Sequence, residues 1–149
     1  FNINNEYETC RLAAQLATCA SKGQIIALTG ELGVGKTAFA RAYVQKLIGK
    51  KEEVISPTFT LVQIYETASF PIYHFDFYRI NDPEEVGELG FEEAVETGLV
   101  LIEWPSRLGN LLPTKRLDIV IKQGHLSHSR KVEISVHEYW YDKIFETLN

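Results

Sequence analysis

Gly30-Glu31-Leu32-Gly33-Val34-Gly35-Lys36-Thr37 is the stretch of this 149-residue chain that decides its fold. It matches the pattern G-x-x-x-x-G-K-[ST], whose glycines let the backbone wrap closely around phosphate oxygens. An apolar run at residues 24–29 precedes it, and residues 36–48 follow it with apolar side chains at helical spacing. A buried strand, a glycine-rich loop and a helix in this order predict a P-loop that holds a nucleotide at the helix N-terminus.

The residue types in this loop predict ATP or ADP and Mg²⁺ as cofactors. Lys36 offers a positive charge to the terminal phosphates, and Thr37 offers a hydroxyl to magnesium, whose other ligands are usually waters and phosphate oxygens. The cofactor-binding residues expected from the motif are Gly30, Glu31, Leu32, Gly33, Val34, Gly35, Lys36 and Thr37. The alternative is a degenerate loop that binds nothing, which the preceding strand and the following helix disfavour.

Two acidic residues stand where an ATPase needs a carboxylate for its metal ion or its attacking water. Asp76 lies in a strand-like segment, where the two-residue period puts it on a polar face with His74 and Tyr78. Glu103 ends the apolar run 99–102, and ligands of open α/β sheets bind at such strand ends. Both acids are candidates for catalysis and metal binding, the alternative for each being a solvated strand-end acid. His74 either orients the Asp76 carboxylate or is an ordinary half-buried histidine.

The rest of the chain predicts a three-layer α/β/α domain. Three further helices are expected, at 10–21 with Thr9 as N-cap, from Asp82 towards Thr97 with a break near Gly87 or Gly90, and at 139–148. Further strands are expected at 59–65, 117–121 and 131–136. We therefore expect a single P-loop domain over residues 1–149, with a mainly parallel central sheet and antiparallel additions from the C-terminal hairpin.

Composition and charge limit the classes of function. Hydrophobic residues make up 45% of the chain, which suits one domain with its own core. A formal net charge of -5 argues against gripping nucleic acid directly, because neutralising phosphates needs clustered Lys and Arg. The chain has no apolar run of about 20 residues, as a membrane-spanning helix needs, and its start lacks the basic-then-apolar layout of a signal peptide. Its cysteines, Cys10 and Cys19, are too widely spaced for a C-x-x-C site, and two reduced thiols fit the cytosol. We therefore expect a cytoplasmic protein that does not enter a membrane.

Four segments together resemble the bacterial TsaE (YjeE) family. They are Gly30-Glu31-Leu32-Gly33-Val34-Gly35-Lys36-Thr37, Ser56-Pro57-Thr58-Phe59-Thr60-Leu61, His74-Phe75-Asp76-Phe77-Tyr78-Arg79 and Glu103-Trp104-Pro105-Ser106-Arg107. The P-loop is shared by many families, but the ordered S-P-T-F-T-L, H-x-D-x-Y-R and E-W-P-x-R segments are difficult to place elsewhere. The resemblance covers nearly the whole chain.

The resemblance implies a small ATPase that is needed for the N6-threonylcarbamoyl modification (t6A) of adenosine 37 in tRNAs reading codons that begin with A. It implies action with the TsaB and TsaD proteins, without carrying the threonylcarbamoyl group itself. The acidic net charge agrees with a protein that reaches tRNA only through these partners.

The resemblance also implies residue roles. Lys36 and Thr37 correspond to the phosphate-binding and magnesium-binding residues of the family, and Asp76 and Glu103 to the acids that serve metal and catalysis. Trp104, which composition alone would assign to the core, corresponds to a tryptophan beside the nucleotide.

Further roles come from the same resemblance. Residues 56–58 resemble a switch-type loop, and Glu6, Thr9 and Arg130 would contact the base or ribose. Ala38 occupies a cofactor-contacting position where many relatives have a second hydroxyl residue, so nucleotide binding here would depend more on Thr37 and on backbone N–H groups.

Two other functions fit the same motif. A small-molecule kinase also combines a P-loop with an aspartate, although 149 residues leave little room for an acceptor site and an arginine-bearing lid. A non-catalytic nucleotide sensor would bind ADP or ATP and present a surface to a partner. Detection of free phosphate or of a phosphorylated acceptor distinguishes the three.

Overall fold

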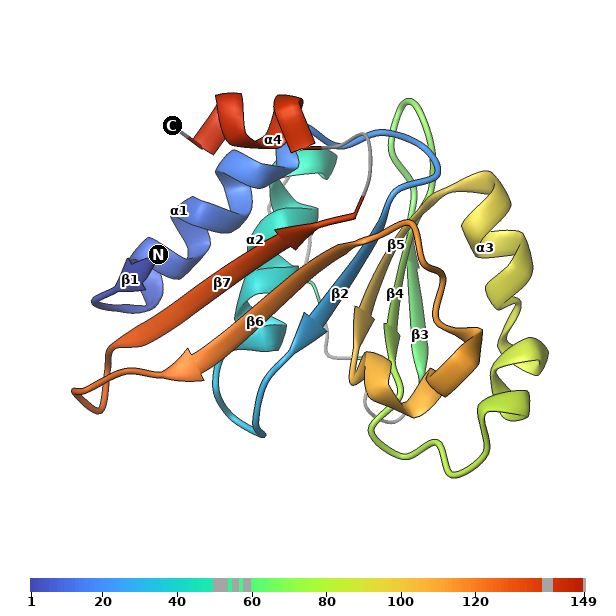
Figure 1. Cartoon of the computed structure of the whole chain (residues 1–149). Helices are drawn as coiled ribbons and strands as arrows, with labels where there is room; N and C mark the ends of the chain where they lie inside the picture. Colours follow the sequence, from blue (N-terminus) through green and yellow to red (C-terminus); the bar gives the residue numbers. More distant parts are fainter. Residues whose placement is uncertain (50–53, 55–56, 58–59, 138–140, 149) are drawn as a thin grey trace.

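The computed structural model describes residues 1–149 except 50–53, 55–56, 58–59, 138–140 and 149 (Figure 1). Its described strands form one sheet in the order β1-β7-β6-β2-β5-β4-β3. Their bounds are β1 Asn2–Ile3, β2 Ile25–Thr29, β3 Val62–Tyr65, β4 Ile72–Asp76, β5 Leu99–Glu103, β6 Leu117–Gln123 and β7 Arg130–Val136. The helices are α1 Glu6–Ala17, α2 Lys36–Ile48, α3 Phe91–Thr97 and α4 Tyr141–Leu148, with 3₁₀ helices η1 Pro83–Leu89 and η2 Pro105–Leu111.

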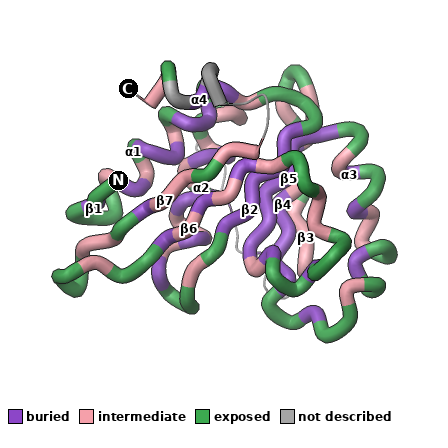
Figure 2. Tube along the Cα trace, in the orientation of Figure 1, coloured by how far each residue is buried: buried purple, intermediate pink, exposed green. Residues whose placement is uncertain are grey.

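Helices cover both faces of the sheet, as the alternation of side chains along β5 shows. Leu99 and Leu101 belong to the hydrophobic core that α1 and α2 close, whereas Val100 and Ile102 belong to the core beneath α3, η1 and η2. Figure 2 shows the buried residues concentrated in the central strands β2, β5 and β4. The expected α/β domain with helices on both faces is therefore confirmed for the described residues.

The sheet is mixed rather than mainly parallel, which corrects the expectation from sequence. The neighbours β6, β2, β5 and β4 run parallel, but β1–β7, β6–β7 and β3–β4 are antiparallel. The antiparallel C-terminal hairpin was expected. Two further antiparallel pairs among the described strands were not expected. One is the pairing of the two-residue strand β1 with β7. The other, β3–β4, arises because only residues 66–71 join the two strands, too few for the crossover that a parallel pair requires.

The first helix begins one turn earlier than predicted. Asn5, not Thr9, is the N-cap, since the Asn5 side chain accepts a 2.9 Å hydrogen bond from the Glu8 backbone N–H. Thr9 is buried inside the helix, which ends at Ala17 instead of residue 21. This early start brings the first turn of α1 beside the glycine-rich loop.

The segment after Asp82 also differs from a single broken α-helix. Asp82 caps the element as predicted, but residues up to Leu89 form the 3₁₀ helix η1. Gly90, at φ 77°, then separates η1 from α3, so one of the two predicted break points is confirmed. Among the described residues no helix is both long and apolar enough to cross a membrane.

Candidate functional site

The glycine-rich loop, residues 30–35, connects β2 to α2 and exposes the N-terminus of that helix. Gly33 and Gly35 have φ values of 79° and 120°, which side chains with a Cβ rarely adopt. Helix N-termini carry free N–H groups and a partial positive charge, both of which favour anions. The loop geometry therefore suits phosphate oxygens.

Gly30 is required for a different reason, namely close packing against β6. A Cβ built at Gly30 would lie 2.6 Å from the Ile121 carbonyl oxygen and 2.6 Å from Val34 Cγ1. We expect Gly30→Ala to lower the free energy of unfolding by about 1–3 kcal/mol, and to weaken ADP binding because the loop must shift. Denaturant unfolding and calorimetric titration measure both effects.

The matched control for Gly30→Ala is Gly87→Ala in η1. A Cβ at Gly87 would meet nothing within 4 Å, so this variant should unfold and bind ADP like the parent. If Gly30→Ala unfolded and bound ADP like its control, the close approach between the loop and β6 would not require a glycine at residue 30.

Lys36 folds back over the loop that it follows. Its Nζ donates hydrogen bonds to the carbonyl oxygens of Gly30 and Glu31, the latter at 2.9 Å, and lies 4.3 Å from the centre of the Trp104 ring. Burial lowers the pKa of Lys36, while the nearby Glu103 and Asp76 oppose that shift. The loop therefore holds a cation next to the two acids.

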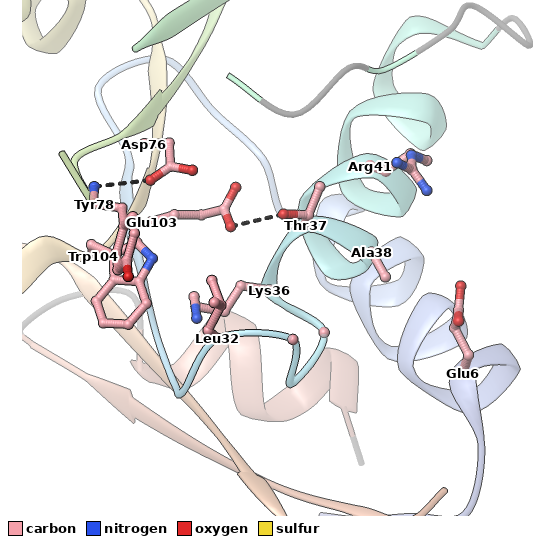
Figure 3. Close-up of a pocket in the computed structure, with 12 residues that line it drawn as sticks. Glu6, Leu32, Lys36, Thr37, Ala38, Arg41, Asp76, Tyr78, Glu103 and Trp104 are labelled. Carbon is pink, nitrogen blue, oxygen red and sulfur yellow. Dashed lines mark hydrogen bonds between the residues drawn. The ribbon is translucent and has the colours of Figure 1, made fainter. Parts of the chain in front are cut away.

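Thr37, Asp76 and Glu103 meet around one cavity, as expected from their places at strand and helix ends (Figure 3). The register of β4 and β5 pairs Asp76 with Glu103. Thr37 Oγ1 donates a 3.0 Å hydrogen bond to Glu103 Oε1, and Asp76 Oδ1 accepts a 3.0 Å hydrogen bond from the Tyr78 N–H. Both acids are nearly fully buried, so neither is a solvated strand-end acid.

The cavity has a volume of about 350 Å³. Its lining residues are Glu6, Leu32, Gly33, Gly35, Lys36, Thr37, Ala38, Arg41, Asp76, Tyr78, Glu103 and Trp104. The described residues contain no group of three His, Cys, Asp or Glu side chains that could hold a metal ion. One hydroxyl and two carboxylates nevertheless fit Mg²⁺, which prefers oxygen ligands and takes most of them from waters and phosphates.

Trp104 forms one wall of this cavity. It directly follows β5, has a left-handed backbone at φ 59°, and its ring lies 4.9 Å from that of Tyr78. The side chain is only partly buried and also packs against the hydrophobic core on the α3 side. Trp104 therefore packs partly against the core and also lines the cavity, and its place beside a nucleotide stays a prediction.

A second cavity of about 280 Å³ adjoins the first, with which it shares Glu6, Gly33, Gly35 and Ala38. It is lined by Glu6, Thr9, Gly33, Val34, Gly35, Ala38, His128 and Arg130. The residues expected at the base or ribose, Glu6, Thr9 and Arg130, are therefore brought together. Arg130 is already engaged, since its Nε donates to the Val34 carbonyl at 2.9 Å and its Nη1 donates to two carbonyls of the β6–β7 turn.

Some of the lining residues were not predicted from the sequence. Arg41 follows Thr37 by four residues on α2, a spacing that places both on one helix face and could have indicated Arg41. Nothing in the sequence marked His128 for the second cavity. Of the switch-type segment 56–58, Ser56 and Thr58 lie outside the described residues, and the Pro57 carbonyl accepts a 2.6 Å hydrogen bond from Leu61 N–H.

Comparison with known proteins confirms the resemblance. The family model for the threonylcarbamoyl adenosine biosynthesis protein TsaE matches residues 3–132. The tRNA threonylcarbamoyladenosine biosynthesis protein TsaE of Rickettsia felis is 45% identical over 117 residues, 78% of this chain and 68% of that protein. The Bacillus subtilis protein of that name is 35% identical over 146 residues, 97% of this chain and 90% of that protein.

A solved structure agrees in fold. The crystal structure of Bacillus subtilis YdiB superposes with a TM-score of 0.83 at 31% sequence identity, and covers 99% of this chain and 91% of that one. The match in sequence therefore extends to the arrangement of strands and helices around the glycine-rich loop. This chain belongs to the TsaE family.

Proposed function

We propose that this protein binds ATP with Mg²⁺ through its P-loop and hydrolyses it as a component of t6A biosynthesis. The observation that carries the proposal is the convergence of Lys36, Thr37, Asp76 and Glu103 on one cavity at the N-terminus of α2. Family membership supplies the biological context, since the curated relatives are named for tRNA threonylcarbamoyladenosine biosynthesis.

Each residue at the cavity has a chemical role in this proposal. Lys36 and the backbone N–H groups of residues 30–37 bind the phosphates, and Thr37 with Asp76 and Glu103 holds Mg²⁺. The ion would supply positive charge to the phosphate oxygens. Glu103 and Asp76 would orient the attacking water, and the second cavity, with Glu6, Thr9 and Arg130 in its lining, would hold the nucleoside.

The partners in this proposal are the TsaB and TsaD proteins, in the cytoplasm, with tRNA reached only through them. The net charge of -5 supports indirect contact with tRNA. We expect slow hydrolysis by the protein alone. Arg41 lines the cavity, but its Nε donates to the Val54 carbonyl at 3.1 Å, so a partner is expected to complete the stabilisation of charge in the transition state.

Phosphate release from ATP by the purified protein, with and without TsaB and TsaD, tests the proposal. We expect slow release alone and faster release with both partners. A phosphorylated acceptor in place of free phosphate would indicate the kinase, and ADP binding without turnover in either setting would indicate the nucleotide sensor. A catalytically dead variant of the same chain excludes contaminating ATPases.

We expect ADP binding to change the fluorescence of Trp104, because its ring lies at the cavity wall and 4.3 Å from the Lys36 ammonium, which phosphate would draw away. Emission is followed during ADP titration. Trp140 lies outside the described residues, so the titration is repeated in a Trp140→Phe background. An unchanged signal in that background would show that Trp104 does not sense the nucleotide.

A further inference from the structure

His74 is a fully buried polar residue at the edge of the candidate site. On β4 it lies two residues before Asp76 and therefore on the same face, with Leu101 of β5 as its register partner. Its Nε2 reaches diagonally across to Glu103, 2.7 Å from Oε2. A buried ring nitrogen this close to a buried carboxylate makes a hydrogen bond whose loss leaves both groups unsatisfied.

The surroundings of the ring indicate which nitrogen carries the hydrogen. His74 Nδ1 is buried and has no hydrogen-bond partner among the described residues. A carboxylate without a proton only accepts hydrogen bonds, so its bond to the ring requires a hydrogen on Nε2. A hydrogen on Nε2 leaves Nδ1 as a bare acceptor, which avoids a buried N–H without a partner.

Glu103 is consequently held at both carboxylate oxygens by different elements. His74, from β4, binds Oε2, and Thr37, from the first turn of α2, binds Oε1 at 3.0 Å. Rotation of the carboxylate would break one of these bonds in a site from which water is largely excluded, since Glu103 is only 2% exposed. The two donors together leave one orientation for the group.

We propose that His74 is a positioning residue, whose Nε2–H fixes Oε2 of Glu103 so that Oε1 is presented to Thr37 and the nucleotide cavity. His74 does not line the cavity and acts only through Glu103. The inference rests on the proposed function for its effect on turnover, but the hydrogen-bond arrangement itself is independent of that function.

Two amide substitutions at residue 74 separate the effect of the hydrogen bond to Glu103 from the effect of burying a polar side chain there. In His74→Gln the side-chain nitrogen is as many bonds from Cα as Nε2 is in histidine, so it keeps the donor to Glu103. His74→Asn carries the same amide one methylene shorter and cannot reach Oε2. We expect the asparagine variant to lower the turnover number roughly ten- to hundredfold, as loss of an outer-shell partner typically does, and the glutamine variant to recover most of it.

The split between turnover and binding distinguishes positioning from a structural role. ADP affinity, measured by calorimetry, should change less than about threefold in both variants, because His74 does not line the cavity. In a double variant with Glu103→Gln, His74→Asn should lower turnover little further, since both substitutions act through the Glu103 carboxylate. Thermal unfolding of each variant is measured beside the kinetics.

Nitrogen NMR of the ring in the unmodified protein supplies a readout that needs neither a folded variant nor ATP. We expect the tautomer with hydrogen on Nε2. A hydrogen on Nδ1 alone would overturn the proposal. So would a folded His74→Asn variant with parental turnover, or a double variant in which the losses of turnover from His74→Asn and Glu103→Gln add fully. Absence of ATP hydrolysis by the parent would instead overturn the proposed function and leave the tautomer result standing.

Discussion

Lys36→Ala is expected to remove most of the ATP affinity and turnover while the domain stays folded. The substitution deletes the one side-chain cation that lies against both the glycine-rich loop and the cavity acids in the described structure. A hydrogen bond to a charged group contributes about 1.5–3 kcal/mol, so affinity should fall at least roughly tenfold. The loss of turnover should be larger, because negative charge develops on the leaving oxygen of ADP in the transition state and a nearby cation stabilises it.

Calorimetric titration with ATP and single-turnover phosphate release measure the two effects of Lys36→Ala. Lys46→Ala is the matched control, since Lys46 lies exposed in the last turn of the same helix. Circular dichroism on both variants tests that the fold is retained. Parental binding and hydrolysis by Lys36→Ala would show that residues 30–37 are not a working P-loop.

The position of the site could be predicted from sequence because its parts follow from local rules. The strand, the glycine-rich loop and the helix are consecutive, and their patterns are unambiguous over residues 24–48. Asp76 and Glu103 each end a strand, and the carboxyl ends of parallel neighbours lie at one edge of a sheet. Recognising the two segments as strands was therefore enough to place both acids at the same edge of the sheet, whereas their direct pairing depends on β4 lying next to β5.

The partners of Glu103 depend on long-range packing and could not be predicted in the same way. The sequence predicts that His74 either orients Asp76, the acid two residues away, or is an ordinary half-buried histidine. The structure instead buries it fully and joins it to Glu103 on the next strand. Strand order determines that contact, and composition does not specify strand order. The backbone contact of Arg130 with Val34 likewise spans 96 residues.

The smaller errors, in the N-cap of α1 and in the edges of the sheet, arise where the local sequence does not decide the structure. Asn5 and Thr9 both have side chains suited to an N-cap, and only tertiary packing, which buries Thr9, decides between them. The mixed sheet was missed because β1, at only two residues, carries no sequence pattern, and because the β3–β4 connection is short. These features lie at the sheet edges and do not alter the central strands that hold the site.

Asp76→Asn and Glu103→Gln are expected to slow the hydrolytic step while leaving most of the ATP affinity. Neither carboxylate need bind the nucleotide tightly, since in the proposed function Lys36 and the loop backbone bind the phosphates. Asn at residue 76 keeps an oxygen for the Tyr78 N–H, and Gln at residue 103 keeps one acceptor for His74. The Gln NH2 would then face Thr37 Oγ1, whose hydroxyl can accept a hydrogen bond in place of the one it now donates. The negative charge proposed to orient water and metal is lost, which should slow phosphate release roughly tenfold or more, about 1.4 kcal/mol of barrier.

Single-turnover assays at fixed magnesium, with and without TsaB and TsaD, separate the chemical step from nucleotide exchange for both variants. Glu92→Gln is the matched control, an exposed acid on α3 whose loss should change neither binding nor turnover. Because Glu103 touches Thr37 directly, its substitution should also raise the magnesium concentration needed for half-maximal turnover more than Asp76→Asn does. If Glu103→Gln kept parental turnover in both settings, the catalytic carboxylate would have to be Asp76 or a group supplied by a partner.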